Sequence, residues 1–340
     1  MSFRVELPPT FGQLLRGQAA AGDVQAGSGG GRRRGLVGMW VTSGSTVNAE
    51  ICAGAGLDWI LIDGEHAPLG LSEIQSQLQV IAAYPTTPVV RVPINDRVHI
   101  KQFLDLGAQN LLVPMVNTPE EAQEAVRALR YPPEGVRGVG SALARGARWN
   151  RVPHYLTRAN DELVSLIVQI ETIEAVENAE AIAATDGVDA IFIGPSDLAA
   201  SMGLIGQQGH PEVVAAVHRA IDAGRRAGKP VGINAFDPEL AHGYLDAGID
   251  FILVGADVAL LARQSEKLAA DFIDARAGAA GSGAGVGTGT GAAGSGAGAE
   301  AGESRGATGY GAANAAGSNT AVGPLSVVHA RADRDVPESY

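Results

Sequence analysis

The sequence is 340 residues long and 46% hydrophobic, and its 25 Lys and Arg against 37 Asp and Glu give a formal net charge of −12. This acidic balance argues against a nucleic-acid partner, since no basic face is available to neutralise phosphates. No stretch reaches the roughly 18 uninterrupted apolar residues of a membrane helix, and residues 1–17 lack the apolar core of a signal peptide. Cys52 is the only cysteine, so we expect no internal disulfide and a reducing, cytoplasmic compartment.

The first predicted element is a short helix over residues 10–21. A Gly- and Arg-rich insertion follows it, "GDVQAGSGGGRRRG" from Gly22 to Gly35. Its three arginines could bind an anionic surface, but the composition is more typical of a solvated linker. Residues 1–34 are therefore predicted to form an N-terminal segment outside the main domain.

A regular alternation of strand and helix patterns occupies residues 35–274. The predicted strands are eight short β-rich runs, at 35–43, 58–64, 87–93, 110–117, 164–172, 189–195, 230–236 and 250–256. Helical patterns follow them with clear start signals, as where Thr118 caps a helix, Pro119 occupies its first turn and Glu121 closes a capping box. Eight apolar strands alternating with helices predict an α/β fold, a (β/α)₈ TIM barrel. A doubly wound open sheet is the alternative, but polar residues end several separate strands, which favours the barrel.

The composition changes near Ala275. From there to about Ser318 the chain is mainly Gly and Ala with scattered Ser and Thr. Such a segment has too little apolar surface to offset its ordering entropy, so residues 275–340 are predicted to be a flexible low-complexity tail.

Polar side chains stand at the predicted carboxyl ends of four strands, where a barrel enzyme builds its active site. They are Asp63, Glu65 and His66, Arg91, Gln169 and Glu171, and Ser196 and Asp197. Singly, each has a structural interpretation, such as a helix cap for Asp197 or an ion pair for Arg91. Together on one rim they should meet a ligand, a metal or each other, because burial without partners is costly.

The oxygen-rich set predicts the chemistry. Glu171 and Asp197 are the natural metal pair, which suits Mg²⁺ or Mn²⁺, with Co²⁺ as a third choice. Arg91 could neutralise an oxyanion, His66 could act as a general base near neutral pH, and Asp63 is in range to fix the tautomer of its imidazole. Glu65 could bind metal waters or brace the turn.

The lysines exclude another mechanism. Lys101 and Lys267 lie within predicted helices, and Lys229 precedes a strand at the opposite end of the barrel. None reaches the rim, so a Schiff-base aldolase is disfavoured and a metal-stabilised enolate remains open. No phosphate-binding or dinucleotide-binding glycine motif is present, so we expect no nucleotide cofactor.

Several of these stretches resemble the HpcH/HpaI family of metal-dependent, pyruvate-specific class II aldolases. The resemblance covers about residues 10–274 apart from the insertion, through "LIDGEHAP", "PVVRV", "LLVPMV", "YPPEGVRGVGSALARGARWNRVPHYL", "VQIET" and "IFIGPSDLAASMG". It implies retro-aldol cleavage of a 4-hydroxy-2-oxo acid to pyruvate and an aldehyde. A lyase acting on 2-keto-3-deoxy sugar acids or on an acyl-CoA ester stays open, as does, more remotely, a non-catalytic scaffold.

The resemblance also implies roles for individual residues. Glu171 and Asp197 match metal ligands, Arg91 matches the residue that stabilises the enolate, and His66 and Asp63 match the base and its partner. Binding of the substrate falls to Gln169 and to the backbone around Ser196 and Asp197. The resemblance further implies a homohexamer, a trimer of dimers, in which Asp105 reaches the site of a neighbouring subunit.

Overall fold

The computed structural model describes residues 4–17 and 34–274. Its contacts divide the chain into one unit of Met1–Leu268 with the last two residues, and a second unit of Ala269–Glu338. Of the second unit, residues 269–274 are described, comprising the last residue of helix α11 and the turn η3 (Ala270–Asp274). Most of the predicted insertion and the predicted tail lie outside the described residues. No helix among the residues described is long and apolar enough to cross a membrane.

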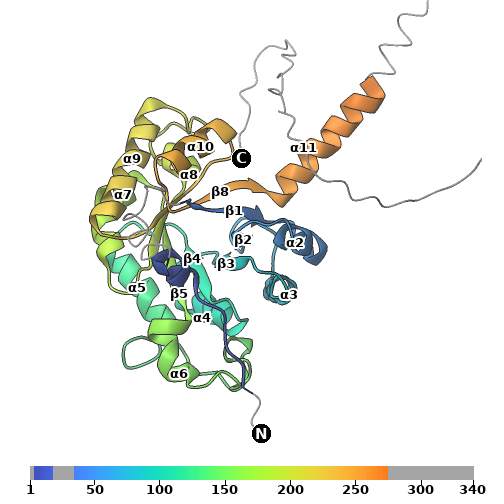
Figure 1. Ribbon diagram of the computed structural model, residues 1–340. Helices are drawn as coiled ribbons and strands as arrows, with labels where there is room; N and C mark the ends of the chain where they lie inside the picture. Colours follow the sequence, from blue (N-terminus) through green and yellow to red (C-terminus); the bar gives the residue numbers. More distant parts are fainter. Residues whose placement is uncertain (1–3, 18–33, 275–340) are drawn as a thin grey trace, which may run out of the picture. The chain divides into compact units, whose positions relative to one another are not determined.

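Eight parallel strands close into a barrel in chain order, which confirms the predicted fold (Figure 1). They are β1 (Leu36–Val41), β2 (Trp59–Asp63), β3 (Thr87–Arg91), β4 (Asn110–Val113), β5 (Ser165–Ile170), β6 (Ala190–Ile193), β7 (Val231–Asn234) and β8 (Phe251–Ala256). Every neighbouring pair is parallel, including β1 with β8. The carboxyl ends of all strands therefore share one rim.

Helices follow the strands along the chain. The main ones are α2 (Thr46–Ala53), α3 (Leu71–Ile81), α4 (Arg97–Asp105), α5 (Pro119–Leu129), α7 (Ile173–Ala184), α9 (Pro211–Arg226), α10 (Pro238–Asp246) and α11 (Asp257–Ala269). Shorter turns occupy two connections: η1 (Arg145–Ala147), α6 (Tyr155–Arg158) and η2 (Ala159–Leu163) before β5, and α8 (Pro195–Ser201) after β6.

The start of α5 shows how the sequence sets these boundaries. Thr118 accepts a hydrogen bond from the backbone N–H of Glu121 at 3.2 Å, and Pro119 occupies the first turn, as predicted. The predicted capping box is wrong in one detail. The Glu121 carboxylate accepts from the backbone N–H of Asn117, one residue before the cap, at 2.6 Å.

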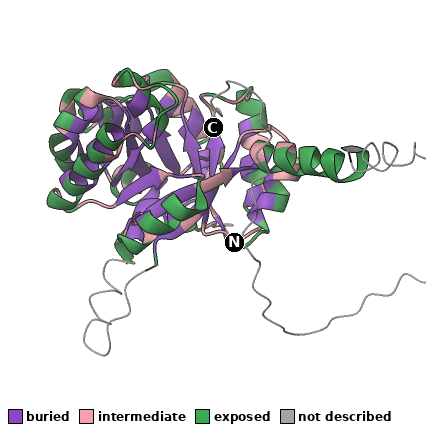
Figure 2. Ribbon diagram, turned by 90° about the horizontal axis from the view of Figure 1, so that it is seen from above, coloured by how far each residue is buried: buried purple, intermediate pink, exposed green. Residues whose placement is uncertain are grey.

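Figure 2 shows that the buried residues lie on the strands and on the helix faces turned toward them. Two apolar cores hold the barrel together. The larger lies between the strands and the surrounding helices, and the smaller fills the barrel interior. Residues 11–17 form the described part of the predicted N-terminal helix. Its Phe11 is fully buried in the interior core, with its ring centroid 5.1 Å from Trp59 and 5.3 Å from Phe251.

Phe11 closes the end of the barrel at which the strands begin. The backbone N–H of Phe11 donates to Asn110 Oδ1 at 2.6 Å, and that of Gly12 donates to Ser165 Oγ at 3.1 Å. Asn110 and Ser165 are the first residues of β4 and β5. The opposite end, where the strands finish, is therefore the open one.

Candidate active site at the carboxyl ends of the strands

Arg91 is the most firmly held side chain of the rim. It ends β3 beside Asp63, which ends β2, and the two residues are paired in the strand register. The guanidinium donates through Nε to Asp63 Oδ1 and through Nη2 to Asp63 Oδ2, both at 2.8 Å. Nη1 pairs with Glu65 Oε2 at 2.9 Å, and the guanidinium carbon lies 4.3 Å from the Trp40 ring centroid. Two carboxylates and an aromatic face thus fix one buried cation.

The Asp63 carboxylate, predicted as the partner of His66, makes its side-chain contacts with Arg91. Its carboxylate is taken up by Arg91, and its contact with His66 is to the backbone N–H, at 3.4 Å, rather than to the imidazole. Burial opposes ionisation of Asp63, but the hydrogen bonds and charge of Arg91 outweigh it, so the pKa of Asp63 is lowered. Asp63 is therefore an anionic partner of Arg91. Glu65 contacts the same guanidinium.

Glu171 directly follows β5 and is almost completely buried. Its Oε1 accepts from the backbone N–H of Met115 at 2.7 Å, and its Oε2 accepts a short hydrogen bond from Gln169 Nε2. Met115 adopts a left-handed conformation with φ 54°, unusual outside glycine. Burial raises the pKa of Glu171 to about 7 although the Met115 hydrogen bond opposes the shift, and the charges of Asp197 and Glu65 raise it further.

The residues after β6 complete this side of the rim. Asp197 lies in the first turn of α8, where Ser196 Oγ accepts from Gln208 Nε2 at 3.2 Å. Gly194 immediately precedes α8, and a Cβ there would lie 2.7 Å from Glu171 Oε2 and 2.9 Å from Gln169 Nε2. Only glycine lets these polar groups occupy the space beside the strand end.

The rim fits a divalent cation, although it does not enclose one. Four carboxylates, those of Asp63, Glu65, Glu171 and Asp197, face a single guanidinium, so a further cation would offset excess negative charge. Gln169 Oε1 is buried and has no hydrogen-bond partner among the residues described. No group of three or more His, Cys, Asp or Glu arranged to hold a metal is found in the described chain. Glu171, Asp197 and Gln169 would thus supply only some of the ligands of the ion. Water molecules or a chelating substrate would supply the others, as is usual for Mg²⁺.

His66 lies exposed in the loop after β2. Its backbone N–H donates to Asp63, and its imidazole makes no hydrogen bond to another described residue. The ring is free to face a ligand, as a base must be.

Asp105 is not brought to this rim. It is the last residue of α4, which starts after the carboxyl end of β3 and runs toward the other end of the barrel. Its Oδ1 accepts from Arg137 Nη2 at 3.2 Å. Within one chain it stands apart from every other predicted site residue.

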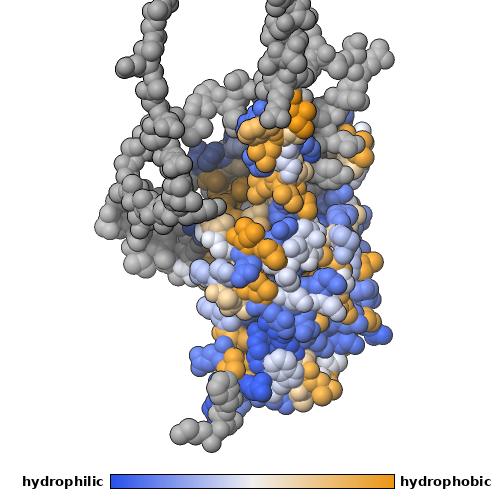
Figure 3. All heavy atoms as spheres, turned by 90° about the vertical axis from the view of Figure 1, so that its right-hand side faces the viewer, coloured by the Kyte–Doolittle hydropathy of each residue, from blue (hydrophilic) through white to orange (hydrophobic). Residues whose placement is uncertain are grey.

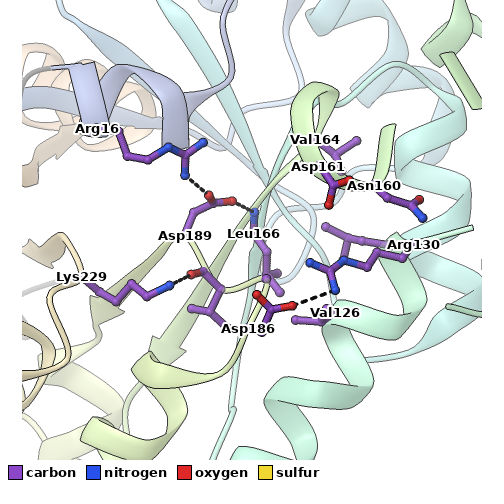
Figure 4. Close-up of a pocket in the computed structure, with 13 residues that line it drawn as sticks. Arg16, Val126, Arg130, Asn160, Asp161, Val164, Leu166, Asp186, Asp189 and Lys229 are labelled. Carbon is purple, nitrogen blue, oxygen red and sulfur yellow. Dashed lines mark hydrogen bonds and ion pairs between the residues drawn. The ribbon is translucent and has the colours of Figure 1, made fainter. Parts of the chain in front are cut away.

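A separate pocket opens near the starts of β5 and β6, at the end opposite the rim (Figure 4). Most of its charged side chains already have a partner within the protein. Arg16 contacts Asp189 at 2.5 Å and Arg130 contacts Asp186 at 3.0 Å, while Lys229 donates to the carbonyl of Val188. This position of Lys229 agrees with its predicted distance from the rim.

Sequence reasoning missed two contributors to the site. Trp40 covers Arg91 and donates through Nε1 to Asn234 Oδ1 at 2.9 Å. The alternation of β1 held a signal for it, because Leu36 and Trp40 both face the barrel interior. No sequence pattern indicated Met115. It contributes its backbone N–H, whose direction depends on the left-handed conformation of Met115 itself.

The closed barrel and its acidic rim, with one fixed guanidinium, are those of a (β/α)₈ enzyme. The family model of the HpcH/HpaI aldolase/citrate lyase family matches residues 36–264, and the chain belongs to this family. It is thereby a carbon–carbon lyase of the aldolase type.

Relatives and solved structures agree with this membership. The chain is 55% identical over 236 residues to the 4-hydroxy-2-oxo-heptane-1,7-dioate aldolase of Escherichia coli, covering 69% of this chain and 90% of that protein. Its counterpart in Klebsiella pneumoniae is 56% identical, with 69% and 89% covered. A family member from Burkholderia cenocepacia superposes with a TM-score of 0.67 at 43% identity, covering 70% of this chain and 94% of that one. Macrophomate synthase gives 0.65 at 27% identity, with 83% and 93% covered.

Proposed function

We propose that this chain cleaves 4-hydroxy-2-oxoheptane-1,7-dioate to pyruvate and succinic semialdehyde, in the breakdown of homoprotocatechuate and 4-hydroxyphenylacetate in the cytoplasm. Relatives 55% identical over nearly their full length carry the corresponding aldolase name. The observation that carries the proposal is the Arg91 clamp, because retro-aldol cleavage develops negative charge on one oxygen.

The side chains of the rim divide the chemistry between them. His66 takes the proton from the C4 hydroxyl, the C4–O bond becomes a carbonyl, and the electron pair of the broken C3–C4 bond forms the enolate of pyruvate. Nη1 and Nη2 of Arg91 each carry two N–H groups, and each uses one of them for Glu65 or Asp63. The remaining N–H groups donate to the enolate oxygen. Protonation at C3 releases pyruvate.

Glu171 and Asp197, with Gln169 Oε1, would hold Mg²⁺, Mn²⁺ or Co²⁺. When bound, such an ion supplies positive charge that polarises the 2-oxo acid. The backbone around Ser196 and Asp197 would receive the substrate carboxylate. Hydrogen bonds from the backbone N–H of Met115 and from Gln169 Nε2 hold the two carboxylate oxygens of Glu171 in place.

We further propose that the working form is a homohexamer, a trimer of dimers. Exposed apolar side chains support an assembly. Figure 3 shows hydrophobic groups gathered on the face that carries α2 and α11, among which the most exposed are Val47, Ile51, Leu261 and Leu268. A second copy of the chain would cover such side chains. In the assembly, Asp105 of one copy would stand at the rim of another.

A pyruvate-release assay tests the function. The full-length protein is given 4-hydroxy-2-oxoheptanedioate and, separately, 2-keto-3-deoxy sugar acids, with each of Mg²⁺, Mn²⁺ and Co²⁺ and with EDTA. We expect the highest kcat/KM for the heptanedioate and loss of turnover in EDTA. A higher kcat/KM for a sugar acid would transfer the assignment to that substrate class. Turnover that survives thorough chelation, or trapping of pyruvate by borohydride, would contradict the metal-dependent mechanism.

A further inference from the structure

Arg137 is a buried cation that takes no part in the rim site. Its side chain has no exposed surface, and its guanidinium carbon lies 4.5 Å from the Tyr131 ring centroid and 5.7 Å from that of Tyr155. Removing a charge from water to this extent is costly unless the charge is paired and hydrogen-bonded. The residue therefore needs a physical reason for its place.

The one carboxylate that Arg137 contacts is that of Asp105. Nη2 donates to Asp105 Oδ1 at 3.2 Å and to the Tyr155 hydroxyl at 3.3 Å. Nε and Nη1 have no hydrogen-bond partner among the described residues. The Asp105 side chain, by contrast, is 30% exposed, so the buried cation holds a carboxylate that still faces outward.

The position of Asp105 determines where that carboxylate can act. The nine residues of α4 carry it about 13 Å from the start of the helix, away from the rim of its own barrel. The loop that follows Arg137 exposes Val139, Leu143 and Trp149, which are 67%, 87% and 50% accessible. An outward carboxylate beside exposed apolar side chains is suited to contact with a second copy of the chain.

We propose that Arg137 is a positioning residue: in contact with the rings of Tyr131 and Tyr155, it fixes the direction of the Asp105 carboxylate for the rim of a neighbouring copy. This inference rests on the proposed function and on the proposed assembly. The two tyrosine rings fix the guanidinium, and the guanidinium limits the rotamers open to Asp105. Because α4 carries Asp105 away from its own rim, the proposed role falls on the rim of a neighbouring copy.

Subunit mixing tests this role. Arg137→Met keeps His66 but loses the anchor of Asp105, whereas His66→Ala keeps both Arg137 and Asp105. Each variant alone should fall about 10²-fold or more in kcat, since a misplaced group far from the chemistry can cost that much. Co-expressed and purified as a mixed assembly, the two should recover turnover well above either alone, because some sites then combine an intact His66 with a held Asp105.

Further variants test whether Arg137 and Asp105 act as one unit. Asp105→Asn, Arg137→Met and the double variant should lose the same activity, because both changes disable one unit. If Arg137→Met does not fold, Tyr155→Phe removes the hydroxyl that accepts from Arg137, keeps the ring, and should show a smaller loss that the same mixing repairs. No recovery on mixing, or full activity of Arg137→Met, would overturn the proposal. A wild-type protein that releases no pyruvate would instead refute the proposed function.

Discussion

At the scale of single residues, the rim is governed by an imbalance of charge. One guanidinium, Arg91, stands among four carboxylates, and the two nearest, Asp63 and Glu65, are used to hold it. Glu171 is left buried with a raised pKa and a backbone donor. The groups that fix Arg91 are therefore distinct from those that could bind a cation. The imidazole of His66 makes no hydrogen bond to another described residue.

His66→Ala tests the proposed base. We expect kcat to fall by about 10²–10⁴ while the protein stays folded, because a positioned general base contributes that much and His66 is exposed. Pyruvate release measures kcat, and circular dichroism checks the fold. His99→Ala is the matched control, since His99 lies on α4 and pairs with Asp96. Near-normal turnover of His66→Ala would remove His66 from the mechanism.

The pKa of Glu171 predicts how stability depends on pH in the metal-free protein. Burial raises that pKa to about 7 from an ordinary value of 4.5, so between these values the folded state holds a proton that the unfolded chain has lost. By linkage, stability falls as pH rises through this range and levels off above it. Thermal melting in EDTA between about pH 5 and 8 should show the decline. Glu171→Gln should lack this part of it, and an identical profile for the variant would contradict the assignment to Glu171.

At the scale of elements, the sequence predicted the features that depend on local residue patterns, namely the strands and the polar residues that follow them. Apolar runs bounded by turn residues located all eight strands, and the predicted run 164–172 contains β5. Rim residues such as Glu171 and Asp197 were found because they follow strands. An ion pair was one interpretation of Arg91, but its partner Asp63 was not identified, because the pairing depends on the register between β2 and β3, which no local pattern records. For Asp105, the family resemblance named a site residue that lies far from the rim within a single chain.

A helix cap provides a prediction at this scale. Thr118→Ala should lower the free energy of unfolding by about 1 kcal/mol, because the backbone N–H of Glu121 loses its acceptor at the start of α5. Thr118→Ser keeps the hydroxyl and should stay close to wild type. Urea denaturation of both variants under identical conditions measures the difference. Equal destabilisation by the two changes would show that the methyl group, not the hydrogen bond, matters.

At the scale of the whole molecule, α11 differs from the other main helices that follow the strands. Asp257 is its one buried residue among those described, and Figure 1 shows the helix extending away from the strands instead of lying along them. Val258, Leu260, Leu261 and Leu268 are all exposed on it. A helix of this kind gains stability only when another surface covers its apolar side chains.

Leu261→Lys should therefore shift the protein toward smaller species in light scattering coupled to size-exclusion chromatography. Glu266→Lys places the same side chain on the same helix at an already charged position and should leave the mass unchanged. If the wild type is monomeric, or if both variants keep its mass, α11 is not part of a subunit contact.

The helix of residues 11–17 has a kinetic consequence. Because Phe11 fills the barrel where the strands begin, we expect substrate to enter and both products to leave at the other end. In the proposed reaction the pyruvate half of the substrate lies against the buried Arg91, so we expect the aldehyde to depart first. Release in that order makes pyruvate a competitive inhibitor against the substrate and the aldehyde a noncompetitive one, and initial-rate measurements with each product added distinguish this order from a random one.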